Sequence, residues 1–160
     1  MKRSEALAPL SREHHIALDV ALVLRRADEH GLPDAVDRYL QFFAAHGSTH
    51  FAEEEAVLVP LLPSEYADRL LAEHALLRHD TRKLEARADL DAAHRLGELL
   101  AAHVRFEERE AFPHLDASGY VAAFQLSGKL DRAAPLWTLR RIIVPELSGP
   151  ELLREMRRDF

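Results

Sequence analysis

The stretch from His50 to Pro60 reads HFAEEEAVLVP, and the stretch from His103 to Pro113 reads HVRFEEREAFP. Both follow the pattern H-x-x-x-E-E-x-x-x-x-P, and the two copies are 53 residues apart. Residues four positions apart in an α-helix lie on the same face, one turn apart. The closing proline is typical of a position where a helix ends. The pattern therefore predicts two equivalent helices, each presenting an imidazole and a carboxylate side by side.

The residue types in this pattern favour a transition-metal site. Neutral imidazole and carboxylate together suit iron, manganese or zinc, and they do not suit calcium. A duplicated amphipathic helix without a site would repeat apolar positions, and it would not obviously repeat a His and a Glu. The chain has ten His and no Cys. The absence of Cys excludes disulfides, Fe–S ligation, thiolate zinc sites and thiol nucleophiles, so a metal must be held by His and carboxylate.

Size and charge set the broad class. The 160 residues, of which 48% are hydrophobic and 30% charged, fit one domain with a single core. The net charge of −6 disfavours nucleic acid as a partner. The N-terminal stretch carries basic residues without an apolar segment, and no stretch approaches the ~18 apolar residues of a membrane span. We expect a soluble, cytoplasmic protein, a monomer or homodimer, without a nucleic-acid or membrane partner.

Apolar residues recur at helical spacing, and no segment of useful length alternates with the period of a strand. Four helices are predicted, at residues 11–31, 33–60, 64–84 and 89–113. Their lengths and short connections predict an all-α, up-down-up-down four-helix bundle. We assign residues 1–127 to the bundle. We expect residues 128–160 to form a C-terminal helical extension that packs on the bundle or forms a dimer contact.

The first and third predicted helices must supply further ligands. Two consecutive histidines, His14 and His15, lie in the first, and His74 lies in the third. An offset of 59 pairs His15 with His74, whereas an offset of 60 pairs His14 with His74, together with the Glu before each. We favour His15, because it leads a stripe with Leu18 and Leu22, and keep His14 as the alternative. The two side chains are ~100° apart around the helix, so both are not expected to face inward.

The resulting set has one His from each helix and one Glu from the second and fourth: His15, His50, Glu54, His74, His103 and Glu107. Two carboxylates that project between four helices can bridge two divalent ions. Together with one hydroxide they would offset three of the four positive charges. Because the protein supplies only a few ligands, each ion keeps coordination positions for water, O2 or another small ligand. Since His binds metal in its neutral form, affinity should fall as the pH drops below the His range.

These motifs resemble the hemerythrin-like (HHE cation-binding) family. An early His in the first helix, H-x-x-x-E in the second and fourth, and a His in the third carry the resemblance, over roughly residues 8–120. It implies a four-helix bundle with two iron ions, bridged by carboxylates and an oxo or hydroxo group. It also implies binding or sensing of O2, NO or related small ligands, or of iron itself. Matched motif by motif, the implied ligands are the six residues named above.

The sequence departs from the family pattern at one position. Members that carry oxygen have a second His four residues after the His of the third helix, where this chain has Arg78. We expect the following residue, His79, to lie outside the site, which leaves reversible O2 carriage open. In some members the acidic ligand of the fourth helix lies five residues after its His, which here is Glu108. We favour Glu107 because it repeats Glu54, and we keep Glu108 as the alternative.

The remaining acidic residues near the motifs, Glu53, Glu55 and Glu110, could line an entrance or be solvated. We favour solvation, with Glu110 as the exception to watch because it corresponds to Val57 in the first copy of the repeat. Two other functions stay open. One is a di-iron or di-manganese enzyme acting on peroxide or O2, although the E-x-x-H pairs of ferritin-like oxidases do not occur in this chain. The other is a metal-free helical interaction module with structural His. The residues favour a protein that binds metal and a small diatomic ligand or peroxide over an enzyme, and they do not choose between iron, manganese and zinc.

Overall fold

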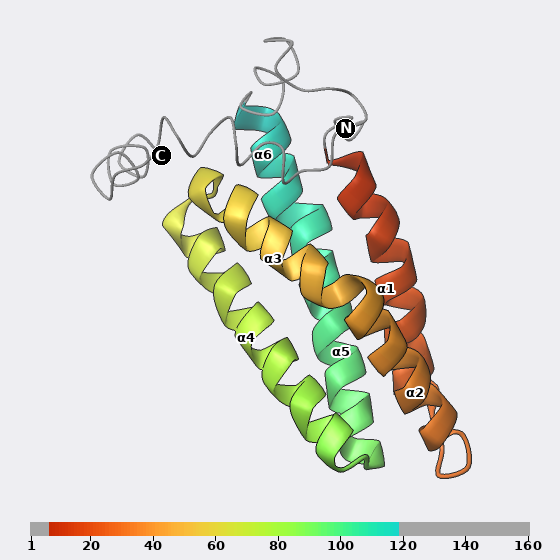
Figure 1. The fold of residues 1–160 in the computed structure, drawn as a ribbon. Coiled ribbons are helices and arrows are strands. Elements are labelled where there is room, and N and C mark those ends of the chain that lie inside the picture. Colours follow the sequence, from red (N-terminus) through yellow and green to blue (C-terminus); the bar gives the residue numbers. More distant parts are fainter. Residues whose placement is uncertain (1–6, 119–160) are drawn as a thin grey trace.

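The computed structural model describes residues 7–118, which form four helical rods that alternate in direction (Figure 1). The first rod is α1 (Ala8–Arg26). The second rod consists of α2 (Leu32–Phe42), the π-helical turn η1 (Phe43–Gly47) and α3 (Ser48–Val57), and it is followed by the 3-10 turn η2 (Val59–Leu61). The third rod is α4 (Ser64–Ala86), and the fourth consists of α5 (Leu90–Phe106), the π-helical turn η3 (Glu107–Ala111) and α6 (Phe112–Ser118).

The predicted all-α, four-helix bundle is confirmed, and residues 7–118 contain no strand. None of the helices in this range is long and apolar enough to cross a lipid bilayer. The C-terminal extension predicted at residues 128–160 lies outside the described residues, as does the end of the predicted bundle domain at residue 127.

Helix ends follow the sequence in part. Asp89, at the predicted start of the fourth helix, caps α5, because its Oδ1 accepts a hydrogen bond of 2.8 Å from the backbone N–H of Ala92. The predicted end of the fourth helix at Pro113 is wrong, since the helical path continues into α6. Pro113 is the second residue of α6, directly after η3. Proline is tolerated in the first turn of a helical segment, where its missing N–H and its ring interfere least.

The core consists of two apolar clusters with a polar layer between them. Along α1, Leu10 belongs to one cluster and Ala17 to the other, and His14 lies between them. Along α4, Leu70 belongs to the first cluster and Leu77 to the second, and His74 lies between them. Charged or polar groups are costly to bury unless they are paired or bind an ion. A layer of such groups between two well-packed halves of the core therefore marks the place where a functional site is expected.

Helices α1 and α5 approach closely because one of the facing residues is a glycine. A Cβ atom at Gly97 would lie 2.7 Å from the backbone oxygen of Ala21 and 2.8 Å from Cγ of Arg25. Real Cβ atoms do not come so near to a backbone atom, so a side chain at this position would force the helices apart. The close contact fixes the position of α1 relative to α5.

Candidate metal centre

Helix α1 brings His14, and not His15, into the polar layer. His14 is buried, whereas His15 is exposed. The expected orientation of His15 is thus corrected by one residue, and the alternative register with an offset of 60 describes the structure. The stripe used to choose His15 runs along the outer side of the helix, since Leu22 is 37% exposed. The inward face of α1 instead includes Leu10, His14, Ala17, Ala21 and Leu24, all of which are buried.

The two copies of the repeated motif place their residues as the helical spacing predicts. His50 and Glu54 project inward from α3, and Glu54 is completely buried. His103 projects inward from the end of α5, and Glu107, also completely buried, projects from the start of η3. The third rod contributes His74, again fully buried. Of the six residues predicted as ligands, five therefore lie in the polar layer, and His14 takes the place of His15.

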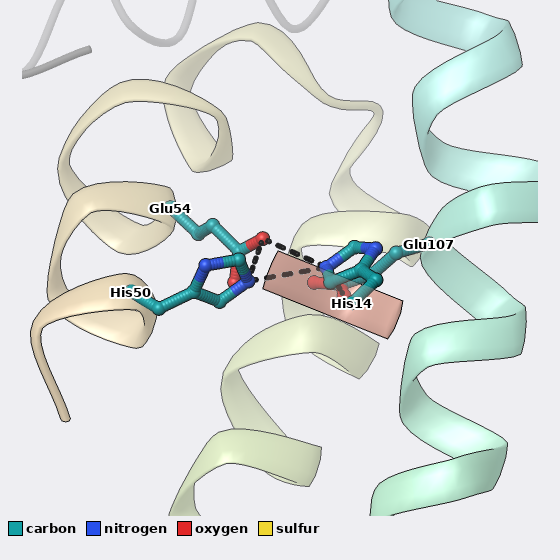
Figure 2. A group of neighbouring side chains, drawn as sticks. All are labelled: His14, His50, Glu54 and Glu107. Atoms are coloured by element: carbon teal, nitrogen blue, oxygen red, sulfur yellow. Dashed lines mark hydrogen bonds and ion pairs between the residues drawn. The ribbon is translucent and has the colours of Figure 1, made fainter. Parts of the chain in front are cut away.

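These six side chains form two groups that share their carboxylates. The first group contains His14, His50, Glu54 and Glu107 (Figure 2). The second contains His74 and His103 with the same two glutamates. Within each group, one candidate ligand atom from every residue lies within 4.8 Å of all the others. Four ligand atoms so close together can surround a single metal ion.

Each shared carboxylate directs one oxygen to each group. In Glu54, Oε1 lies 3.1 Å from Nε2 of His50 and Oε2 lies 3.4 Å from Nε2 of His74. In Glu107, Oε2 lies 3.1 Å from Nε2 of His14 and Oε1 lies 3.3 Å from Nε2 of His103. None of these four oxygens has a partner in hydrogen-bond geometry, although all are buried. Buried carboxylate oxygens without hydrogen bonds are costly, unless a cation lies between them and the imidazoles.

The imidazole nitrogens are also spaced for shared ions. The Nε2 atoms of His14 and His50 are 3.1 Å apart, and those of His74 and His103 are also 3.1 Å apart. Two nitrogens that each lie about 2.1 Å from one ion, at roughly 90–110° to each other, are about 3.0 to 3.4 Å apart. The observed separations fit two imidazoles bound to one ion in each group.

The outer nitrogen of each imidazole faces a further glutamate. Nδ1 of His50 lies 2.7 Å from Glu13, and the same atom in His74, His103 and His14 lies 2.8 to 2.9 Å from Glu55, Glu73 and Glu108, respectively. A carboxylate on Nδ1 fixes the tautomer in which Nδ1 carries the proton and Nε2 offers a lone pair. In their neutral form, all four imidazoles would therefore direct a lone pair towards the centre of the bundle.

Sequence reasoning missed these outer glutamates, although the signal was present. In α1 and α4 they directly precede the buried His, at Glu13 and Glu73. In the repeated motif they are the second residue of the Glu-Glu pair, at Glu55 and Glu108. The expectation that Glu55 is solvated is wrong, since its side chain is only 28% exposed and contacts His74. Glu108, the alternative ligand, contacts the outer nitrogen of His14 and does not belong to the inner groups.

The last alternative ligand, His79, and its neighbour Arg78 both lie outside the inner groups. His79 is exposed on α4, as expected, and belongs to neither group. Arg78, at the position where oxygen-carrying members have a His, binds Glu55, with Nη1 2.6 Å from Oε1. The side chain at this position is thus an outer partner of the polar layer, and it does not join the inner groups.

The electrostatics of the metal-free cluster favour protons at the positions that a metal would take. Burial alone would lower the pKa of His14, but contacts with Glu107, Glu108 and Glu54 raise it to about 11. The pKa of His50 rises to about 10, because Glu54 and Glu13 outweigh the effect of burial. Burial raises the pKa of Glu54, yet the surrounding imidazoles hold it well below its usual range. The carboxylate of Glu54 is thus ionised and attracts cations.

A small cavity lies against the first group. Its lining includes His14, His50 and Glu107 together with the apolar side chains of Phe42 and Leu100. The space open to the centre of a water-sized sphere is ≈ 10 Å³, which is about enough for one water molecule. A ligand of one or two atoms can therefore approach the inner atoms of this group, whereas a larger molecule requires the walls to move.

A family model described as the hemerythrin HHE cation binding domain matches residues 6–115. The chain belongs to this family. No curated protein and no solved structure gives a match. The matched residues include all six members of the inner groups and all four outer glutamates. The HHE domain of this chain thus has a buried His/Glu cluster that is suited to binding metal, in agreement with the predicted resemblance.

Proposed function

We propose that this HHE domain binds two iron ions, one in each group, and that the pair of ions binds O2, NO or a related small ligand. The observation that carries the proposal is that both inner carboxylates face both groups. Each of Glu54 and Glu107 directs one oxygen to the first group and the other oxygen to the second. Carboxylates arranged in this way suit two ions held side by side. A structural role for the histidines would not require their Nε2 atoms to converge.

The set of donors supports iron. Each group offers two imidazole nitrogens and two carboxylate oxygens. Calcium and magnesium prefer oxygen ligands alone, whereas combined imidazole and carboxylate ligation with open positions is typical of non-haem iron. Four protein ligands would leave an ion that prefers six with positions for a small ligand. When bound, iron would supply one-electron chemistry and such an open position.

The surrounding residues prepare the site for this role. The outer glutamates orient the imidazoles, and Phe51 stacks on His74 with 4.1 Å between ring centroids, which excludes water from that side. The cavity beside the first group gives a small ligand a place near the inner atoms. Only a ligand of a few atoms fits there, so the geometry favours diatomic molecules over organic substrates.

The proposal can be tested with protein loaded anaerobically with Fe(II) and freed of excess metal. We expect two irons per chain, and absorption bands that change when azide or NO is added. His74→Ala should reduce the iron content and the spectral response, whereas His79→Ala, on the exposed side of the same helix, should leave both unchanged. Iron-loaded protein whose spectrum does not respond to azide or NO would refute the small-ligand part of the proposal. A chain that retains no iron would refute all of it.

A further inference from the structure

Arg78 contacts the carboxylate oxygen that orients one of the inner imidazoles. Its Nη1 lies 2.6 Å from Oε1 of Glu55, and Nδ1 of His74 lies 2.9 Å from the same oxygen. If Nε2 binds a metal, Nδ1 of His74 would carry the proton and donate a hydrogen bond to Oε1 of Glu55. Arg78 and His74 therefore share a single acceptor atom, and a stronger bond to one weakens the bond to the other.

The shared oxygen lies in a partly shielded place. The side chains of Arg78 and Glu55 are 30% and 28% exposed, and His74 is fully buried. Cζ of Arg78 lies 5.6 Å from the ring centroid of Phe51, which stacks on His74 at an interplanar angle of 15°. Partial burial limits the screening of the guanidinium charge by water. Its effect on Glu55 and His74 is thus larger than that of an arginine in open solvent.

We propose that Arg78 is a positioning residue that raises the reduction potential of the iron bound by His74. This inference depends on the proposed function. A carboxylate on Nδ1 increases the basicity of a metal-bound imidazole, which favours the ferric ion. Arg78 donates to the same oxygen of Glu55 and so weakens its hydrogen bond with His74. The increase in the basicity of the imidazole is therefore smaller. The positive charge of Arg78 also opposes the higher charge of the ferric state. Both effects favour the ferrous ion.

Arg69 shows why the contact of Arg78 is distinctive. Arg69 also binds a glutamate that orients an inner imidazole, with Nε 2.8 Å from Oε1 of Glu73. Nδ1 of His103, however, lies 2.9 Å from the other oxygen, Oε2. The two donors at Glu73 do not compete for one atom, and the side chain of Arg69 is 43% exposed. We therefore expect Arg69 to have the weaker influence on the potential.

The test is a potentiometric titration of the iron-loaded full chain, in which dithionite with mediators supplies one electron for each ferric ion reduced to ferrous. Arg78→Gln should lower the midpoint potential, and Arg78→Lys, which keeps the charge, should lie between Arg78→Gln and wild type. Arg82→Gln is the matched control, since it makes the same charge change at an exposed position one turn further along α4. It should leave the potential near that of wild type.

A second variant tests the same inference in the opposite direction. Glu55→Gln weakens the acceptor for His74 and removes a negative charge, so it should raise the midpoint potential. If Arg78→Gln fails to retain iron, the midpoint potentials of Glu55→Gln and Arg78→Lys test the inference in its place. An Arg78→Gln protein with full iron content and the potential of Arg82→Gln would overturn the inference, as would a lowered potential in Glu55→Gln. Wild-type protein without iron would instead refute the proposed function.

Discussion

Oε2 of Glu13 lies 2.7 Å from Nδ1 of His50, although the two residues belong to different rods of the bundle. Glu13 directly precedes His14, so one turn of α1 supplies an inner imidazole and also orients the imidazole of α3 in the same group. Glu73 and His74 have the same relationship to His103. The outer glutamates thus link the rods around the polar layer, and the folding of one helix positions the candidate ligand of another.

Substitution of adjacent histidines in α1 should have opposite outcomes. His14→Ala removes an inner nitrogen from the first group, so iron content should fall from about two ions per chain towards one. His15→Ala alters an exposed side chain and should leave the content unchanged. Elemental analysis of both variants after identical loading checks this prediction. Loss of iron in His15→Ala with retention in His14→Ala would restore the register that the sequence favoured.

Removal of an outer glutamate should weaken metal binding without removing a ligand. Glu13→Gln replaces the carboxylate that accepts the Nδ1 proton of His50, and loss of such a partner typically reduces metal affinity about 10- to 100-fold. Glu53→Gln makes the same charge change one residue before Glu54 and should reduce affinity much less. Competition with a chelator measures both affinities. Equal affinities in the two variants would show that the contact between Glu13 and His50 is not important.

The metal-free protein should lose stability as the pH rises above neutrality. The folded-state pKa values of His14 and His50, about 11 and about 10, exceed the value of about 6.5 in an unfolded chain. Their contribution to stability is therefore fully present below about pH 6.5 and is lost as the pH rises through 10 to 11. The Tm of chelator-treated protein should fall between pH 7 and 10. A Tm that is constant or rises over this window would contradict the prediction.

Metal binding should release these protons, because imidazole binds metal only in its neutral form. Calorimetry in buffers with different ionisation enthalpies should therefore show proton release on binding of Fe(II), and the apparent affinity should increase with pH. Binding without release would indicate that the buried imidazoles are already neutral or are not the ligands.

Gly97→Ala should destabilise the fold without altering the candidate ligands. The added Cβ would lie 2.7 Å from the backbone oxygen of Ala21, which cannot move without shifting α1. Overpacking of this kind typically costs about 1–3 kcal/mol, which should exceed the gain in helix propensity from Gly to Ala. Urea denaturation of the metal-free protein measures the change in the free energy of unfolding. Unchanged or increased stability would show that α1 and α5 can separate easily.

The sequence was sufficient to predict the bundle and most of the cluster, since the two copies of H-x-x-x-E place His and Glu on one helical face by spacing alone. It could not distinguish His14 from His15. Apolar residues occur on both sides of α1, and the side with Leu10, Ala17 and Leu24 is buried, whereas Leu22 is exposed. The choice between the two sides depends on how α1 packs against α5, which spacing along one helix does not reveal.

Other features left no clear signal along the chain. The π-helical turns η1 and η3 depend on hydrogen bonds over five residues, such as that from the N–H of Ser48 to the carbonyl of Phe43, and no residue type specifies them. The role of Glu55 depends on a contact between α3 and α4. That contact becomes apparent only when the relative rotation of the rods is known.

The central claim is that Glu54 and Glu107 lie between two metal ions deep within the bundle. The most direct measurement is an anomalous difference map, recorded at the iron absorption edge, from crystals of the iron-loaded protein. We expect two peaks, one beside His14 and His50 and the other beside His74 and His103, with both carboxylates between them. A single peak, or peaks on the surface of a fully loaded protein, would contradict the account.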